Sequence, residues 1–162
     1  MNKLDNIKGK IVSPEIIARL RAGWRIKDQK VVFTNGCFDV LHVGHVEYLA
    51  KAASLGDILV VGLNSDASVH RLKGPGRPIN NEYARSILLA SLEVVFYVVL
   101  FDDDTPFYLI NIIKPDILVK GADYKVENIV GADILASYSG EVVTIPLTPG
   151  YSTTALLESI KK

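Results

Sequence analysis

The sequence predicts an α/β domain built on a doubly wound parallel sheet. From residue 31 onward, short runs of β-branched and other apolar residues alternate with amphipathic stretches, which is the order that repeated strand–helix units produce. The apolar runs lack an alternation of apolar and polar residues, as expected where helices cover both faces of a parallel sheet. The chain of 162 residues has about the length of one domain. We therefore expect a Rossmann-like domain over residues 31–162, preceded by a helical extension over residues 1–30.

The extension is expected to contain one helix, at residues 14–24. Ser13 is an N-cap candidate, and Pro14 suits the first helical position. Apolar residues then recur at helical spacing. We expect this helix to pack on the main body.

Two strand–helix units follow the extension. The run Val-Val-Phe-Thr at residues 31–34 predicts a strand. Apolar positions spaced i, i+3, i+4, i+7 predict a helix over residues 44–55 that ends at a glycine. A second apolar strand over residues 57–63 precedes a short helix over residues 66–72, which ends at the loop of residues 73–78, rich in Gly and Pro.

The second half of the chain continues the alternation. A helix over residues 81–92 leads to an apolar strand over residues 94–101, and Pro115 closes the helix that comes next. The remaining helices are expected at residues 105–113, 131–138 and 152–160, and the remaining strands at residues 117–120 and 142–145.

The charge composition excludes two classes of partner. The 18 Lys and Arg residues balance 18 Asp and Glu residues, so the chain lacks the basic excess that duplex nucleic acid or an anionic membrane requires. The net charge of zero nevertheless hides two regions of opposite charge. Residues 1–30 carry eight basic and three acidic side chains, and the rest of the chain has the balancing acidic excess. We expect no nucleic-acid partner and no membrane partner, and the balance says nothing against a small anionic ligand.

The single cysteine favours a reducing compartment. Cys37 stands alone, which excludes an intramolecular disulfide and any site built from several cysteines. The N-terminal region has no continuous apolar run typical of a signal peptide, and the longest strongly apolar run, residues 94–101, is far below the ~18 residues of a membrane helix. We expect a cytoplasmic protein.

The loop after the first strand is the richest in chemistry. Parallel sheets bind ligands beyond the carboxyl ends of their strands, and here His42 and His45 stand three residues apart where a helix begins. Their imidazoles would project from one face of its first turn, while Gly44 lets a ligand approach the backbone. A helix start offers N–H groups and a partial positive charge, so we interpret this turn as a nucleotide triphosphate site. A metal site, which would need a third ligand, and a purely structural histidine pair are the alternatives.

Other nucleotide-binding signatures are absent from the sequence. There is no Gly-x-x-x-x-Gly-Lys-Ser/Thr loop, and the first turn has no Gly-x-Gly-x-x-Gly fingerprint. The sequence therefore gives little support to a P-loop kinase or to an NAD-dependent enzyme.

The segment His42-Val43-Gly44-His45 resembles the HxGH signature of the nucleotidyltransferase (cytidylyltransferase-like) superfamily. The segments that strengthen the resemblance are, in the expected order, residues 64–66, 71–74, 77–78, 104–106, 114–116, 119–124 and 150–154. Within the superfamily the chain is most similar to adenylyltransferases acting on D-glycero-β-D-manno-heptose 1-phosphate, the ADP-heptose synthase domains. The resemblance implies in-line attack of the sugar phosphate on the α-phosphorus of ATP, with Mg²⁺ carried mainly by the ATP phosphates.

The resemblance also assigns roles to individual residues. The expected catalytic residues are His42, His45 and Lys73. The expected ATP contacts are Asn35, Gly36, Cys37, Phe38, Gly44, Arg77, Arg85, Lys120, Gly121, Asp123, Ser152 and Thr153. Asp39 and Asp66 are expected to contact the substrate, and no side chain is expected to bind the metal directly.

Several of these residues also have a purely structural interpretation. Lys73 could be a solvated loop lysine, Arg85 could make a surface pair with Glu82, and Ser152 could simply cap the last helix. Cys37 is expected to be a small buried side chain rather than a nucleophile. The acidic run at residues 102–104 is expected to be a solvated turn at a helix start.

Two alternative functions stay open. One is a cytidylyltransferase acting on glycerol 3-phosphate or a similar alcohol phosphate, but such relatives carry an arginine where this chain has Leu147. The other is a non-catalytic nucleotide-binding module, which the presence of both histidines, Lys73 and the Ser-Thr-Thr turn argues against.

The resemblance implies partners as well. Longer members join this domain to a sugar kinase of the ribokinase type, so we expect a separate heptose kinase to act upstream, in lipopolysaccharide or surface polysaccharide synthesis. Members often form homodimers, and we expect a homodimer to which residues 94–99 or the N-terminal helix could contribute.

Overall fold

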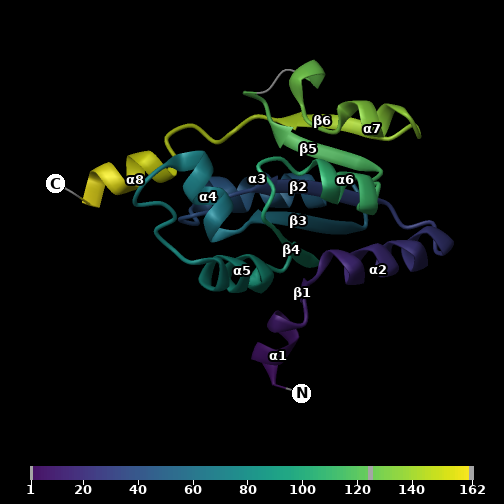
Figure 1. Ribbon diagram of the computed structural model, residues 1–162, viewed down its shortest axis with the longest axis horizontal. Helices are drawn as coiled ribbons and strands as arrows, with labels where there is room; N and C mark the ends of the chain where they lie inside the picture. The colour runs from purple at the N-terminus through teal and green to yellow at the C-terminus, as the bar shows by residue number, and fades with distance from the viewer. Residues whose placement is uncertain (1, 124–125, 161–162) are drawn as a thin grey trace.

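The computed structural model describes residues 2–123 and 126–160 (Figure 1), and it contains one parallel sheet. The strands lie in the order β1-β4-β3-β2-β5-β6, and every neighbouring pair is parallel. Their bounds are Ile11–Val12 (β1), Val31–Gly36 (β2), Ile58–Asn64 (β3), Tyr97–Phe101 (β4), Ile117–Gly121 (β5) and Glu141–Ile145 (β6). The predicted doubly wound α/β fold is confirmed.

Helices cover both faces of this sheet. Their bounds are Lys3–Lys8 (α1), Pro14–Ile26 (α2), Val43–Ala53 (α3), Asp66–Lys73 (α4), Glu82–Ser91 (α5), Phe107–Ile113 (α6), Ala132–Ala136 (α7) and Thr153–Ile160 (α8), with a 3₁₀ turn at Val126–Asn128. Buried side chains of α3 and α5 form one apolar core with the sheet, and those of α2, α6 and α7 form a second core on the opposite face. Neighbouring strand residues such as Val31 and Val32 therefore point into different cores, which explains why the strands show no alternation of polar residues.

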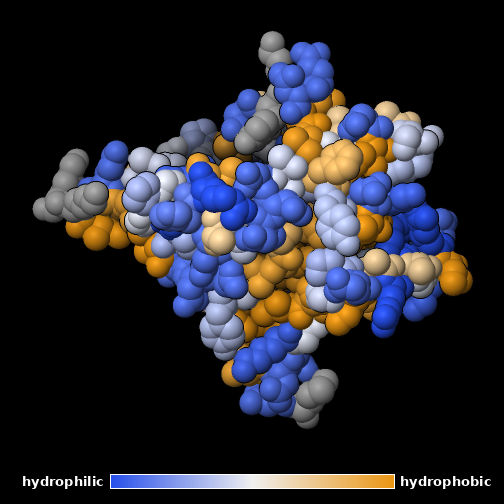
Figure 2. All heavy atoms as spheres, viewed as in Figure 1, coloured by the Kyte–Doolittle hydropathy of each residue, from blue (hydrophilic) through white to orange (hydrophobic). Residues whose placement is uncertain are grey.

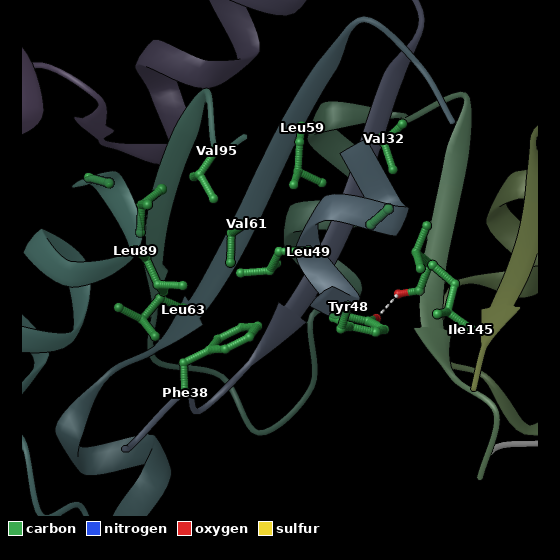
Figure 3. Packing of buried hydrophobic residues seen from close by; sticks show 14 of the residues in the cluster. Val32, Phe38, Tyr48, Leu49, Leu59, Val61, Leu63, Leu89, Val95 and Ile145 are labelled. Carbon is green, nitrogen blue, oxygen red and sulfur yellow. Dashed lines mark hydrogen bonds between the residues drawn. The ribbon is translucent and has the colours of Figure 1, made fainter. Parts of the chain in front are cut away.

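Figure 3 shows how the first core fixes α3 against the sheet. Leu49 packs between Val32 and Val61, and none of the three has exposed surface. The hydroxyl of Tyr48 donates a hydrogen bond to the Val119 carbonyl at 3.2 Å and lies 2.8 Å from the Thr34 hydroxyl. The helix is thereby tied to both β2 and β5, close to the carboxyl ends of these strands.

The N-terminal extension contributes a strand that the sequence did not predict. Ile11 pairs with Val98 and Val12 with Val99, which places β1 at the edge of the sheet beside β4. A strand of two residues is too short to show a pattern. Lys10 anchors it by donating its Nζ to the carbonyls of Leu92 and Val95.

The element boundaries differ from the expected ones by a few residues. The strand expected at residues 94–101 begins only at Tyr97, and Val95 and Val98 from this run are fully buried in the first core. By contrast, β2 continues through Asn35 and Gly36, because both stay in register with β3. In the part of the chain that the structure describes, no helix is long and apolar enough to cross a membrane.

The order of the strands places a crevice between β2 and β5. From β2 the chain moves outward to β3 and β4, and it then returns to the other side of β2 to form β5 and β6. Such a reversal separates the loops that follow the two central strands and leaves space for a ligand beyond their carboxyl ends. In Figure 1 the carboxyl ends face α4 and α8, away from α2.

Candidate functional site

A cavity of about 670 Å³ opens at the crevice and collects most of the predicted site residues. Those lining it are Asn35, Gly36, Cys37, Phe38, Asp39, His42, Gly44, His45, Lys73, Arg77, Lys120, Gly121, Asp123, Ser152 and Thr153. Arg85 and Asp66 do not line it. A second cavity, of about 510 Å³ beneath α1 and before β4, contains none of the predicted residues.

The two histidines stand face to face at the start of α3. Their ring centroids are 3.8 Å apart with an angle of 23° between the planes, and the edge of Phe38 contacts His45 at a centroid distance of 5.2 Å. The Nδ1 atoms of both histidines are buried, and neither has a hydrogen-bond partner among the described residues. Buried ring nitrogens without a partner are rare in folded proteins, which makes this pair a candidate for contact with a ligand.

Burial keeps both imidazoles neutral near pH 7. Burial, and then the proximity of His42, lower the pKa of His45 to about 4. Burial also lowers the pKa of His42 below its ordinary value of 6.5. A neutral imidazole carries one N–H donor, so each ring can donate one hydrogen bond to a phosphate oxygen.

The backbone at this helix start is shaped for close approach. His42 is the N-cap residue of α3, but its side chain does not cap the helix, so the partial positive charge of the helix start is not screened by a side-chain acceptor. A Cβ on Gly44 would lie 3.1 Å from the His42 ring and 3.1 Å from the Cβ of Tyr151. Only glycine fits there without displacing one of these groups.

Lys120 and Asn35 meet across the crevice. Asn35 lies near the end of β2 and Lys120 near the end of β5, and the Lys120 Nζ donates a hydrogen bond to the Asn35 Oδ1. Burial lowers the pKa of Lys120 to about 8. This amine therefore still carries most of its charge at pH 7, in a position between the two central strands.

Lys73 and Arg77 reach the cavity from the segment after β3. Lys73 is the last residue of α4, and its side chain is exposed. The Arg77 Nε donates to the Asp39 Oδ2 at 2.6 Å, and Asp39 is only 3% exposed. Asp39 also accepts the backbone N–H groups of Ile79 and Asn80 at 2.7 and 3.0 Å. The carboxylate predicted to contact substrate is thus engaged in holding the loop.

Arg85 lies beneath the cavity rather than in it. Its side chain has no exposed surface, and it donates to three backbone carbonyls and to the Asp66 carboxylate. Glu82, its expected surface partner, instead accepts the N–H of Asp66 at 2.8 Å. Arg85 and Asp66 therefore pair with each other, and neither lines the cavity in which the predicted ATP and substrate contacts were expected.

The last helix brings hydroxyl groups to the cavity. The Ser152 Oγ accepts the N–H of Ala155 at 3.1 Å and so acts as a cap. The preceding loop is tied to α3, because Thr148 donates its hydroxyl to the Glu47 carboxylate at 2.5 Å. Ser152 and Thr153 line the cavity beside the histidines.

Two further expectations concern Cys37 and the acidic run. Cys37 is half-buried, and burial raises the pKa of its thiol, which disfavours the nucleophilic thiolate. In the acidic run, Asp104 pairs with Arg71 at 2.8 Å. No group of three or more His, Cys, Asp or Glu residues in the described part of the chain could hold a metal ion.

Several lining residues were not predicted as site residues. They are Tyr48, Asn64, Leu72, Asp104, Thr105, Pro106, Asn128, Ile129, Val130, Leu147, Thr148, Tyr151 and Thr154. Asn64 ends β3, and residues 104–106 follow β4, so the rule that found the first loop would also have found these. Residues 128–130 lie beyond the motif at residues 119–124 that the sequence analysis used, so they were not predicted. Residues 124 and 125, the former included in the resemblance, lie outside the described residues.

Comparisons with known proteins agree with the motifs. The "Bifunctional protein HldE" of Trichlorobacter lovleyi is 53% identical over 151 residues, which cover 93% of this chain and 31% of that protein. The protein of the same name from Syntrophotalea carbinolica is 58% identical over 136 residues, 84% of this chain and 28% of that protein. The chain thus spans less than a third of the length of these relatives.

A solved structure extends the comparison. The lipopolysaccharide core biosynthesis protein of Thermoplasma volcanium superposes with a TM-score of 0.62 at 28% identity, covering 74% of this chain and 98% of that one. The family model described as Cytidylyltransferase-like matches residues 33–159, a range that holds both histidines, Lys73 and the Ser-Thr-Thr turn. The chain therefore belongs to the cytidylyltransferase-like family.

Proposed function

We propose that this chain transfers AMP from ATP to D-glycero-β-D-manno-heptose 1-phosphate, giving ADP-heptose and pyrophosphate. The observation that carries the proposal is the stacked pair of neutral imidazoles, with unpartnered ring nitrogens, at an uncapped helix start inside the cavity. Such an arrangement is suited to phosphate oxygens. The high identity to the bifunctional relatives supports the choice within the family.

The reaction needs positioning and charge stabilisation rather than a covalent intermediate. An oxygen of the sugar phosphate attacks the α-phosphorus, and the bond to the pyrophosphate oxygen breaks. His42 and His45 would donate to the phosphates, and Lys73 would approach from the opposite loop to follow the charge that develops on the leaving group. Because both imidazoles are neutral, each would offer the phosphates one N–H donor rather than a positive charge.

Mg²⁺ fits this site as an ion carried by the nucleotide. Asp39 is occupied by Arg77 and two N–H groups, and Asp104 is paired with Arg71. These carboxylates are not free to form an oxygen-rich protein site of the kind Mg²⁺ prefers. When bound with ATP, the ion would neutralise phosphate charge, and the protein would bind the complex through its cationic and N–H donors.

A substrate panel tests the proposal. Pyrophosphate release is measured with ATP or CTP, each in combination with heptose 1-phosphate or glycerol 3-phosphate. Turnover is expected with ATP and heptose 1-phosphate. Turnover with CTP alone would instead establish the cytidylyltransferase alternative, and nucleotide binding without turnover of any pair would indicate a non-catalytic module.

Three wider expectations belong to the same proposal. We propose a cytoplasmic homodimer supplied with heptose 1-phosphate by a heptose kinase. Light scattering on the purified protein tests the dimer. In the described chain Val95, Val98 and Val99 are fully buried, so of the apolar run at residues 94–99 the residues that could contribute to an interface are Val94, Phe96 and Tyr97, of which Phe96 is 45% exposed.

A further inference from the structure

A fully buried arginine organises the floor of the cavity. Arg85 has no exposed surface and makes four hydrogen bonds. Its Nη1 donates to the carbonyls of Cys37 at 2.7 Å and Asn64 at 2.8 Å, which follow β2 and end β3. Arg85 thereby joins the carboxyl ends of two neighbouring strands at the point where both chains enter the site.

The same guanidinium anchors the start of α4. Its Nη2 donates to the Asp66 Oδ1 at 2.7 Å, and the Asp66 N–H donates to Glu82 at 2.8 Å. Both anchors come from α5, which packs against the sheet through Leu89 and Ala90. The helix that ends at Lys73 is therefore fixed at its first residue to a rigid element.

The far side of Lys73 is held by the same network. The Arg85 Nε donates to the Asn80 carbonyl at 2.9 Å. The Asn80 N–H and side-chain amide donate to the carboxylate and the carbonyl of Asp39, at 3.0 and 2.9 Å, and Asp39 also binds Arg77. Residues 66 and 80, on either side of Lys73, are thus both bound directly to Arg85.

Between the two anchors the chain carries Lys73 at the end of α4, followed by a turn with two glycines. Gly74 and Gly76 have φ values of 86° and 78°, and a Cβ on either would meet no atom within 4 Å. These glycines allow backbone conformations that other residues resist. Lys73 therefore lies at the end of a helix whose first residue is fixed, directly before a turn with open space around its two glycines.

Resting on the proposed function, we propose that Arg85 is a positioning residue that acts through Lys73. It holds both ends of the segment at residues 66–80 so that the Lys73 ammonium meets the phosphates. Four of its five N–H donors are already used inside the protein, which disfavours a direct phosphate contact.

A double-mutant cycle tests this role. Arg85→Lys keeps the positive charge but loses the planar guanidinium that donates to four acceptors. We expect kcat to fall by a factor between about ten and a hundred. In a Lys73→Ala background the same change is expected to cause little further loss, because the group that Arg85 positions is gone. If the fold-loss of kcat in the double variant equalled the product of the two single fold-losses, Arg85 would act independently of Lys73 and the proposal would be overturned.

Two further variants separate positioning from general damage. Asp66→Asn removes the negative charge of one partner of Arg85 at a half-exposed position, and it is expected to lower kcat by a smaller factor, with the same dependence on Lys73. Ile113→Val, in the core on the opposite face of the sheet, is chosen to destabilise the fold with kcat unchanged. If Ile113→Val reduced kcat as much as Arg85→Lys did, the effect would be one of stability, and the proposal would fail.

Hydrogen exchange keeps the test independent of the substrate assignment. In Arg85→Lys the amides of residues 66–80 are expected to exchange faster, while those of β4 and α6 are expected to be unchanged. Uniform acceleration over the whole chain would contradict the proposal. If no substrate pair is turned over by the unmodified protein, the proposed function fails, and exchange confined to residues 66–80 would still support the anchoring role.

Discussion

Buried polar groups lack hydrogen-bond partners at the start of α3, whereas those beneath the cavity are hydrogen-bonded within the protein. At the start of α3, the Nδ1 atoms of His42 and His45 are buried without a partner in the described chain. On the cavity floor, Arg85 makes four hydrogen bonds, and the Asp39 carboxylate accepts three. An unpaired buried polar atom costs about 1–3 kcal/mol, whereas a satisfied network holds its elements in place.

On the proposed function, this difference separates groups that would bind the ligand from groups that hold the site. Unsatisfied donors and acceptors gain their partners when a ligand arrives, so part of their cost is recovered in binding. Satisfied groups gain nothing from the ligand, but they fix the loops that carry the binding residues. Substitutions at the histidines should therefore change activity with little effect on stability, and substitutions in the network should change stability as well.

The largest expected effect is the loss of turnover in His45→Ala. The substitution removes the ring that we propose donates to the reacting phosphate, and loss of one such donor lowers kcat on the order of 10²–10³-fold. The free energy of unfolding is expected to stay within about 1 kcal/mol of the original, because the lost packing on Phe38 is offset by the removal of an unpaired nitrogen. Pyrophosphate release and urea unfolding measure the two quantities.

His70→Ala is the matched control for that variant. His70 is the third histidine of the chain, lies on α4, is exposed and does not line the cavity. Its substitution should leave both turnover and stability unchanged. Activity close to that of the original protein in His45→Ala would refute the role assigned to His45.

The same contrast explains what the sequence could predict. The histidine turn can be predicted from neighbouring residues alone. His42 and His45 are three residues apart, between a strand and a helix whose apolar patterns are clear in the sequence. The partners of Arg85 are not local, because the carbonyl of Cys37 is 48 residues away and that of Asn64 is 21 residues away. From the sequence, a basic residue near a helix start and a candidate phosphate site is therefore predicted to contact the ligand, and only the fold shows that Arg85 is buried.

Short or weakly patterned elements were missed for a related reason. β1 has two residues and is defined by its pairing with β4, which no local pattern contains. α1 and α8 have no buried residues, yet α8 was predicted and α1 was not, since α8 has the Gly and Ser-Thr-Thr signal at its start. Figure 2 shows apolar side chains at the far end of α8, where Ile160 is 78% exposed.

An intermediate effect is expected from Asp39→Asn, which acts on the satisfied part of the cavity. The amide that replaces the carboxylate can accept fewer of the three hydrogen bonds and leaves Arg77 without its ionic partner. We expect the free energy of unfolding to fall by about 2–3 kcal/mol, measured by urea unfolding. Turnover should also decrease, because the segment that carries Lys73 loses one of its anchors.

Arg71→Gln provides the comparison for that loss. Arg71 also pairs with an aspartate at close range, at 2.8 Å from Asp104, but both side chains are largely exposed. Exposed pairs contribute little to stability, so the unfolding midpoint should not move measurably. Equal destabilisation by Arg71→Gln and Asp39→Asn would mean that burial does not distinguish the two ion pairs.

One expected effect is absent at neutral pH: a dependence of stability on pH that originates in His45. Burial and His42 lower its pKa to about 4, below the ordinary value of 6.5. Between these values the unfolded chain binds a proton that the folded chain does not, so the free energy of unfolding falls as the pH decreases from about 6.5 to 4. Above pH 6.5 the term vanishes. Urea unfolding of the original protein and of His45→Ala at several pH values isolates it, because the acidic residues common to both chains cancel in the difference. His45→Ala should gain stability relative to the original protein as the pH falls through this window, and a difference independent of pH would show that the imidazole is not held neutral by its surroundings.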